Sequence, residues 1–240
     1  WGGSLGNRAR IHLEIIKKCR EEVGNDFAIS IKMNSADFQK GGFSPEDSIQ
    51  VAKLFSDSGI DNIEISGGTY EQPRLLGLDK VSINPKRSEN RKESTIAREA
   101  YFLSYAEEIA KVVNIPLMVT GGFRTKEGME AALRDGACEI VGVGRPLCAN
   151  PYAIKELLSG QIDELPKYEK TLSIGPWWLS PTSPFRLIQA INAFSAQAWF
   201  YQQIKKMGKG LMPDLNLKPW KAFREDAKAD QEAIKEYQNF

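Results

Sequence analysis

The sequence is poor in cysteine and histidine, and it contains no long apolar run. Its three cysteines, Cys19, Cys138 and Cys148, are odd in number and lack a C-x-x-C spacing, which argues against a disulfide framework and against a zinc site. This cysteine usage favours a reducing, cytoplasmic setting. The chain also lacks a run of about 18 apolar residues, the length that crosses a bilayer, so we expect no membrane partner.

An excess of charge of one sign is missing as well. Lysine and arginine total 32, aspartate and glutamate total 31, and the net charge is +1. The chain therefore has no overall attraction for nucleic acid, and none is expected as a partner. The N-terminal letters WGGSLGNR include neither an initiating methionine nor the apolar core of a signal peptide. We expect this chain to be a piece of a longer polypeptide.

Helical and strand-like patterns alternate with short connections from Ser4 to about residue 160. This alternation is typical of an α/β fold with a parallel sheet and crossover helices. Beyond residue 160 the rhythm stops, so we expect two parts, 1–160 and 161–240. The expected strands are 27–34, 62–66, 116–120 and 139–143, and the expected helices are 7–23, 44–58, 95–113, 126–134 and 151–158.

Two glycine-containing segments, Val119–Gly122 and Val141–Arg145, each end a strand-like run and precede a helical pattern. Glycines allow the backbone to approach a phosphate, and the N–H groups that open the next helix favour its charge. The last two βα units of a (β/α)8 barrel form a phosphate site in this way. Arg145 adds a fixed positive charge with forked donors. The plain alternatives are two simple turns and a surface ion pair for Arg145.

Alternation in the first two strands predicts which side chains face the inside of a barrel. Lys32 lies in the small or polar set of its strand and Glu64 in that of the next, and such a set is typical of the interior near a site. We therefore expect Lys32 and Glu64 to share the interior face, where each limits the cost of burying the other. Lys32 is either part of a site or an interior lysine paired with Glu64.

A long irregular stretch follows the second strand, from Gly67 to about Lys92. Loops of this length inside a domain are usually functional or disordered, and a loop after a barrel strand lies on the active face. Tyr70 and Arg74 are candidate substrate contacts on this loop, and the alternative is that both are simply solvated.

The last part of the chain has a different composition. An irregular segment contains Trp177 and Trp178, and residues 185–207 have the pattern of one amphipathic helix. We expect the apolar side of this helix to pack in a core or an interface, with the two tryptophans as anchors. Covering the barrel and forming a dimer are the two packing alternatives, and lying on a membrane is the less favoured one, since only Lys205, Lys206 and Lys209 cluster at the end of the helix. The apolar side consists of Leu187, Ile188, Ile191, Phe194, Ala198 and Tyr201.

Four of these elements together resemble the old yellow enzyme family of FMN-dependent NAD(P)H oxidoreductases, over roughly residues 1–160. They are the letters GGSLGNRAR at positions 2–10, the strand Ile31–Asn34, the Gly121-Gly122 turn and the segment Gly144–Leu147. The opening letters are the most specific of the four. The resemblance implies a (β/α)8 TIM barrel of which this chain forms the second half, strands five to eight, followed by a helical C-terminal extension.

The resemblance also implies FMN as cofactor and NADH or NADPH as reductant. By it, Gly121, Gly122, Gly144 and Arg145 bind the FMN phosphate, and Lys32 lies near the N1–C2=O edge of the flavin. A positive charge at that edge stabilises the anionic reduced flavin. The family usually has arginine there, and lysine keeps the charge but loses the forked donor geometry.

The implied reaction is an ene-reduction, in which hydride passes from flavin N5 to the β-carbon of an α,β-unsaturated carbonyl compound. The resemblance places the catalytic residues, which are carbonyl donors and a proton-donating tyrosine, upstream of Trp1. His12 is the one histidine and lies in the first helix, so it does not take that role. No metal is expected.

Half a barrel has two open sheet edges and an uncovered interior. We therefore expect either a fragment of a longer chain or a protein that pairs with a complementing N-terminal half or with a second copy. Two other functions remain open. One is a truncated, non-catalytic half-barrel that binds flavin or phosphate, and the other is a different phosphate-handling TIM-barrel enzyme.

Overall fold

A computed structural model describes residues 1–37, 41–67 and 102–238. The chain forms two compact units, Trp1–Val143 and Gly144–Phe240. Each unit has a hydrophobic core of its own. The boundary between the two compact units therefore lies before residue 160, where the composition of the sequence changes. The division into functional domains at residue 160 stays a prediction.

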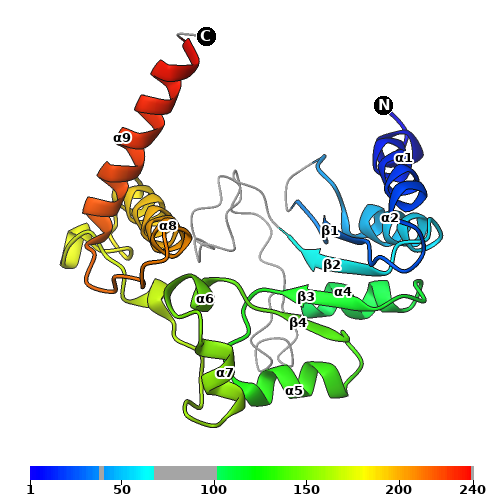
Figure 1. Ribbon diagram of the computed structural model, residues 1–240, viewed down its shortest axis with the longest axis horizontal. Coiled ribbons are helices and arrows are strands. Elements are labelled where there is room, and N and C mark those ends of the chain that lie inside the picture. Colours follow the sequence, from blue (N-terminus) through cyan, green and yellow to red (C-terminus); the bar gives the residue numbers. More distant parts are fainter. Residues whose placement is uncertain (38–40, 68–101, 239–240) are drawn as a thin grey trace. The chain divides into compact units, whose positions relative to one another are not determined.

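The first unit is built on a four-stranded parallel sheet (Figure 1). Its strands lie side by side in chain order, which is the arrangement of one half of a (β/α)8 barrel. The predicted α/β class and the predicted strands are confirmed, although every strand except the second is shorter than expected. The strands are β1 (Ser30–Asn34), β2 (Asn62–Ser66), β3 (Leu117–Thr120) and β4 (Ile140–Gly142).

Side-chain caps fix where several helices of the first unit begin. The hydroxyls of Ser44 and Thr125 each accept a hydrogen bond from a backbone N–H three residues on, at 3.1 Å, which satisfies a donor that the helix leaves unpaired. Residues 95–101 of the expected helix 95–113 lie outside the described residues. The helices are α1 (Leu5–Val23), α2 (Pro45–Ser56), α4 (Leu103–Ala110) and α5 (Lys126–Arg134).

The core of the first unit lies on the helix-facing side of the sheet. Ile63, Ile65 and Val119 are fully buried there, packed with residues of α2 and α4. Helix α1 contributes Ala9 and Ile16, the two residues on its buried side. In the sequence, Ile11, Ile15, Cys19 and Val23 are spaced four apart, a spacing that favours one apolar helix side, but in the structure these four side chains are exposed. The side of helix α1 that covers the core is therefore the side of Ala9 and Ile16.

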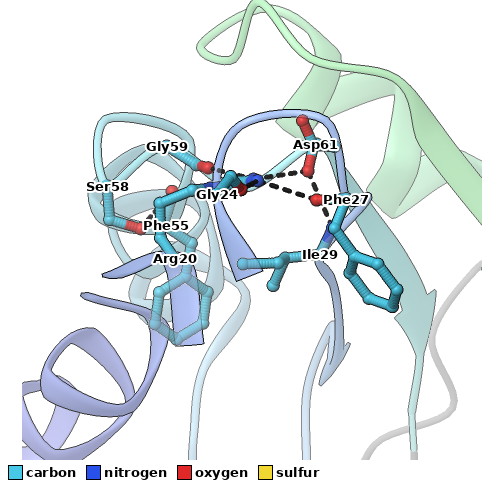
Figure 2. Close-up of polar contacts among 8 residues, drawn as sticks. All are labelled: Arg20, Gly24, Phe27, Ile29, Phe55, Ser58, Gly59 and Asp61. Atoms are coloured by element: carbon cyan, nitrogen blue, oxygen red, sulfur yellow. Dashed lines mark hydrogen bonds and ion pairs between the residues drawn. The ribbon is translucent and has the colours of Figure 1, made fainter. Parts of the chain in front are cut away.

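One arginine connects three segments at the amino-terminal end of the sheet (Figure 2). Arg20 Nη1 donates to the carbonyl oxygens of Gly24 and Phe27, at 2.8 and 2.7 Å. Its Nη2 donates to the Gly59 carbonyl at 2.9 Å and to Asp61 Oδ2 at 2.6 Å. Asp61 Oδ2 also accepts the Ile29 N–H at 2.7 Å. The end of α1, the start of β1 and the turn before β2 are therefore joined.

The second unit is helical. The expected helix 151–158 is shorter, as α7 (Ala153–Leu158), and a separate short helix, α6 (Arg145–Ala149), precedes it. Two 3-10 turns, η2 (Tyr168–Lys170) and η3 (Trp177–Leu179), lead to the long helices α8 (Arg186–Gly208) and α9 (Pro219–Gln238). Among the described residues, no helix is both long and apolar enough to cross a membrane.

Several positions on the expected apolar side of helix α8 do not belong to the core of this unit, and their packing in an interface stays a prediction. Leu187, Phe194 and Tyr201 are exposed by 71%, 57% and 44%, although all three belong to the apolar stripe. Asn192 and Gln203 are buried instead, because their side chains bind loop backbone. Asn192 donates to the Leu179 carbonyl, and Gln203 exchanges two hydrogen bonds with the backbone of Asp214.

The tryptophans predicted as anchors are also exposed. Trp177 and Trp178 have 87% and 61% of their surface in solvent. The buried anchor is Trp199 in the middle of α8, which is 1% exposed and donates its Nε1–H to the Leu217 carbonyl at 2.9 Å. Its ring lies 5.2 Å from Phe200 and 5.8 Å from Tyr168, measured between centroids.

Candidate functional site

The face of the sheet opposite the core carries polar side chains in register. Lys32 pairs with Glu64, Met118 and Ile140 across the four strands, which forms a middle layer. Two residues further along each strand, toward the carboxyl ends, the same face carries Asn34, Ser66, Thr120 and Gly142. Carboxyl ends of parallel strands are where barrel enzymes place their sites. The expectation that the small or polar set faces the interior is confirmed, since Ile31 and Met33 pack against the core.

Lys32 and Glu64 form an ion pair on this face. Lys32 Nζ lies 2.7 Å from Glu64 Oε1, and the two residues are direct partners in the register of β1 and β2. The lysine side chain is 56% exposed and the glutamate side chain 19%. The predicted pairing is therefore confirmed. Its geometry leaves the ammonium accessible from the open side of the sheet while the carboxylate is largely enclosed.

Thr120 and Gly142 fit together at the carboxyl end of β3 and β4. A Cβ atom at Gly142 would collide with the Thr120 side chain, so glycine is required by the close approach of these two residues. Thr120 Oγ1 is buried and has no hydrogen-bond partner within the described ranges. Both residues lie within the two glycine-containing segments that the sequence indicates, Val119–Gly122 and Val141–Arg145, but the sequence gives neither of them an individual role.

The two glycines after β3 have a conformation that favours glycine. Gly121 and Gly122 have φ angles of 118° and 93°, a region that other L-residues rarely adopt. The turn therefore needs glycine for its backbone shape alone. This supports the plain interpretation as a strand-to-helix turn, and it is equally compatible with a backbone that approaches a ligand.

Gly144 and Arg145 open the second unit. Gly144 has a φ of −115°, an ordinary value, and a Cβ atom there would meet nothing within 4 Å. No backbone strain therefore explains this glycine, and the space above it is open. Arg145 Nη1 lies 3.9 Å from Glu169 Oε1, and both side chains are mostly buried. Helix α6 has only five residues, so the positive charge at this point comes from Arg145 itself, and the contact with Glu169 agrees with the alternative that this arginine forms an ion pair.

Two of the three cysteines, Cys138 and Cys148, are unsuited to nucleophilic chemistry. Burial raises the pKa of the Cys138 thiol to about 11, and burial also raises the pKa of the Cys148 thiol. Both thiols are therefore protonated near neutral pH, and the thiolate is the reactive form. The burial of Cys148 therefore favours a packing role for this side chain over a reactive one.

The remaining candidates fall outside this site. Tyr70 and Arg74 lie outside the described residues, and their assignment as substrate contacts stays a prediction. His12 is exposed on α1, and its ring centroid is 6.0 Å from that of Phe55. Within the described part of the chain, no group of three or more His, Cys, Asp or Glu side chains could bind a metal ion.

Comparison with known proteins identifies relatives of both units. The profile of the NADH:flavin oxidoreductase / NADH oxidase family matches residues 1–164. An NADH-dependent flavin oxidoreductase (iccE) of Talaromyces variabilis is 32% identical over 213 residues, which are 87% of this chain and 49% of that protein. The NADH oxidase of Thermoanaerobacter brockii is 32% identical over 207 residues, 86% of this chain and 29% of that protein. These alignments are too long to end at residue 164, so the similarity extends into the second unit.

A solved structure supports the same fold. The structure of 2-naphthoyl-CoA reductase with 2-naphthoyl-CoA is similar with a TM-score of 0.55 and 29% identity, over 69% of this chain and 23% of that chain. This chain therefore spans half or less of the length of the proteins that it matches.

Proposed function

Because the chain belongs to the NADH:flavin oxidoreductase / NADH oxidase family, we propose that it forms the FMN-binding half of an NAD(P)H-dependent oxidoreductase. The proposed substrates are α,β-unsaturated carbonyl compounds, as in ene-reductases. Relatives named as NADH-dependent flavin oxidoreductase and NADH oxidase support a flavin and an NADH-type reductant. Because the chain spans only part of each relative, a complementing N-terminal half or a second copy is part of the proposal.

The residues present fit FMN, and the interior face of the sheet carries this proposal. An accessible ammonium on Lys32 lies in the layer below a row of small and polar side chains. That row includes Thr120, whose buried hydroxyl has no protein partner in the described segments. A planar ligand with polar edges would satisfy this hydroxyl, and a purely apolar ligand would not.

Each group of residues has a proposed role. Arg145 and the backbone of Gly121, Gly122 and Gly144 bind the phosphate, where the guanidinium supplies paired charged donors. Lys32 lies at the N1–C2=O edge of the flavin and stabilises negative charge there. When bound, FMN supplies the hydride chemistry, taking a hydride from NAD(P)H and passing it to the acceptor.

The proposal also assigns roles outside the interior face of the sheet. The carbonyl donors and the proton donor are assigned to residues upstream of Trp1, and Tyr70 and Arg74 are assigned to the substrate. The proposed setting is the cytoplasm, which the cysteine usage supports.

The proposal is tested by titrating the purified chain with FMN and then adding NADPH or NADH and a cyclic enone. We expect the flavin absorbance to shift on binding and the thermal transition to rise with FMN concentration, because a ligand that binds the folded state stabilises it. Failure to bind FMN contradicts the proposal. Binding without turnover, even when the N-terminal half is supplied, favours the non-catalytic alternative.

Changing Arg145 to alanine should weaken FMN binding by about 10- to 100-fold, the effect of losing charge-assisted hydrogen bonds to a phosphate. Riboflavin, which has no phosphate, should bind both proteins equally. Fluorescence titration of the two ligands measures the difference. Arg186→Ala, an exposed arginine of the same unit, is the matched control and should change neither affinity. Equal weakening of FMN and riboflavin would exclude Arg145 from the phosphate site.

A further inference from the structure

The ion pair between Lys32 and Glu64 has an asymmetric environment. The carboxylate is the more enclosed partner, with 19% of its side chain exposed against 56% for the lysine. In the register of the sheet, Glu64 on β2 is aligned with Met118 on β3, and Met118 is aligned with Ile140 on β4. Glu64 is therefore the fixed partner, placed by a central strand, and the long flexible side chain of Lys32 reaches to it.

The pair has no net charge, which matters for any ligand above it. A lone ammonium stabilises negative charge on a nearby ligand over several ångströms. A carboxylate 2.7 Å away opposes this effect, so that the pair acts more as a dipole than as a full charge. The strength of the positive charge offered by Lys32 therefore depends on Glu64.

We propose that Glu64 sets the reduction potential of the bound flavin by fixing Lys32 and offsetting its charge. This inference rests on the proposed function. Lys32 alone would favour reduced, more negative FMN over oxidised FMN, and Glu64 reduces that preference. Glu64 is thus a positioning residue that acts through Lys32, and it holds the potential lower than a free cation at the same place would.

The test is the Glu64→Gln variant of the full chain with bound FMN. Glutamine has the same shape without the charge, and it can still accept a hydrogen bond from the lysine. We expect the ratio of the affinities for reduced and oxidised FMN to rise about tenfold, which is ~30 mV for a two-electron couple. Equilibration with a reference dye measures the potential, and the affinity for oxidised FMN is titrated separately.

Three further variants separate charge from structure. Glu64→Asp keeps the charge and should keep most of the original potential. Lys32→Met removes the cation and should shift the potential in the opposite direction, downward. Glu130→Gln removes one negative charge from an exposed position on α5 and should leave the potential unchanged. If Glu64→Gln does not fold, Glu64→Met replaces it, since an unbranched apolar chain suits a site beside Met118.

The possible results distinguish the two levels of the proposal. A parent chain that binds no FMN overturns the proposed function and this inference with it. A parent chain that binds FMN, combined with an uncharged variant at position 64 whose potential is unchanged or lower, overturns this inference alone. The inference is supported if the uncharged variant at position 64 raises the reduction potential and Glu64→Asp does not.

Discussion

Replacing Trp199 with alanine should destabilise the second unit by about 3–5 kcal/mol, the usual cost of removing a large aromatic side chain from a core. The indole is 1% exposed and contacts the rings of Phe200 and Tyr168. The substitution also removes the donor to the Leu217 carbonyl. This loss is a large part of the stability of a small domain. We therefore expect the helical signal of α8 and α9 to disappear at a much lower urea concentration than in the parent.

Urea unfolding followed by far-ultraviolet circular dichroism measures this change. Trp178→Ala is the matched control, because that ring is 61% exposed and its loss should change stability by less than about 0.5 kcal/mol. Trp199→Phe keeps part of the ring packing and loses the N–H, so an intermediate effect is expected. Equal destabilisation by the two alanine variants would contradict the assignment of Trp199 as the anchor.

Changing Arg20 to alanine should destabilise the first unit by about 2 kcal/mol, because it removes hydrogen bonds between a charged group and three carbonyls and a carboxylate. The side chain is 19% exposed, so water replaces only part of what is lost. Thermal unfolding of the variant and the parent measures the difference. Lys18→Ala breaks an exposed ion pair on the same helix and should have little effect.

The Arg20 effect should also depend on pH. Hydrogen bonds from the Ile29 N–H and from Arg20 lower the pKa of Asp61 below its usual value. A carboxylate with a lowered pKa stabilises the fold fully above the unfolded value of about 3.9, and this contribution is lost as the pH falls through the folded value. The difference between the Arg20 variant and the parent should therefore be constant near neutrality and shrink in acid below about pH 4. A difference that grew in acid would contradict the role of Asp61.

Local signals in the sequence predicted the sheet unit well. Strand β2 and helix α5 have the predicted bounds, since Thr125 caps α5 and Gly136, with a φ of 70°, follows its end. The pairing of Lys32 with Glu64 followed from alternation alone. Strand β1 begins later than predicted because alternation continues through Phe27, which is 62% exposed and precedes the strand.

Signals that depend on distant partners were not visible in the sequence. Helix α8 buries Asn192 and Gln203 because particular loop carbonyls and amides lie opposite them, and hydrophobic periodicity contains no information about such partners. Helix α6 was missed because it has five residues and contains Pro146 near its start. The phosphate roles of the glycines and of Arg145 stay predictions, because they depend on a ligand.

The contact between Gly67 and Phe102 has a consequence for how such proteins diversify. A Cβ atom at Gly67 would lie 2.6 Å from Phe102 Cε1, so the two residues that flank segment 68–101 lie directly against each other. Chain inserted between two such fixed ends costs only closure entropy, about 0.6 kcal/mol for each doubling of length. The connection after β2 can therefore differ in length between related proteins without a change in the register of the four strands.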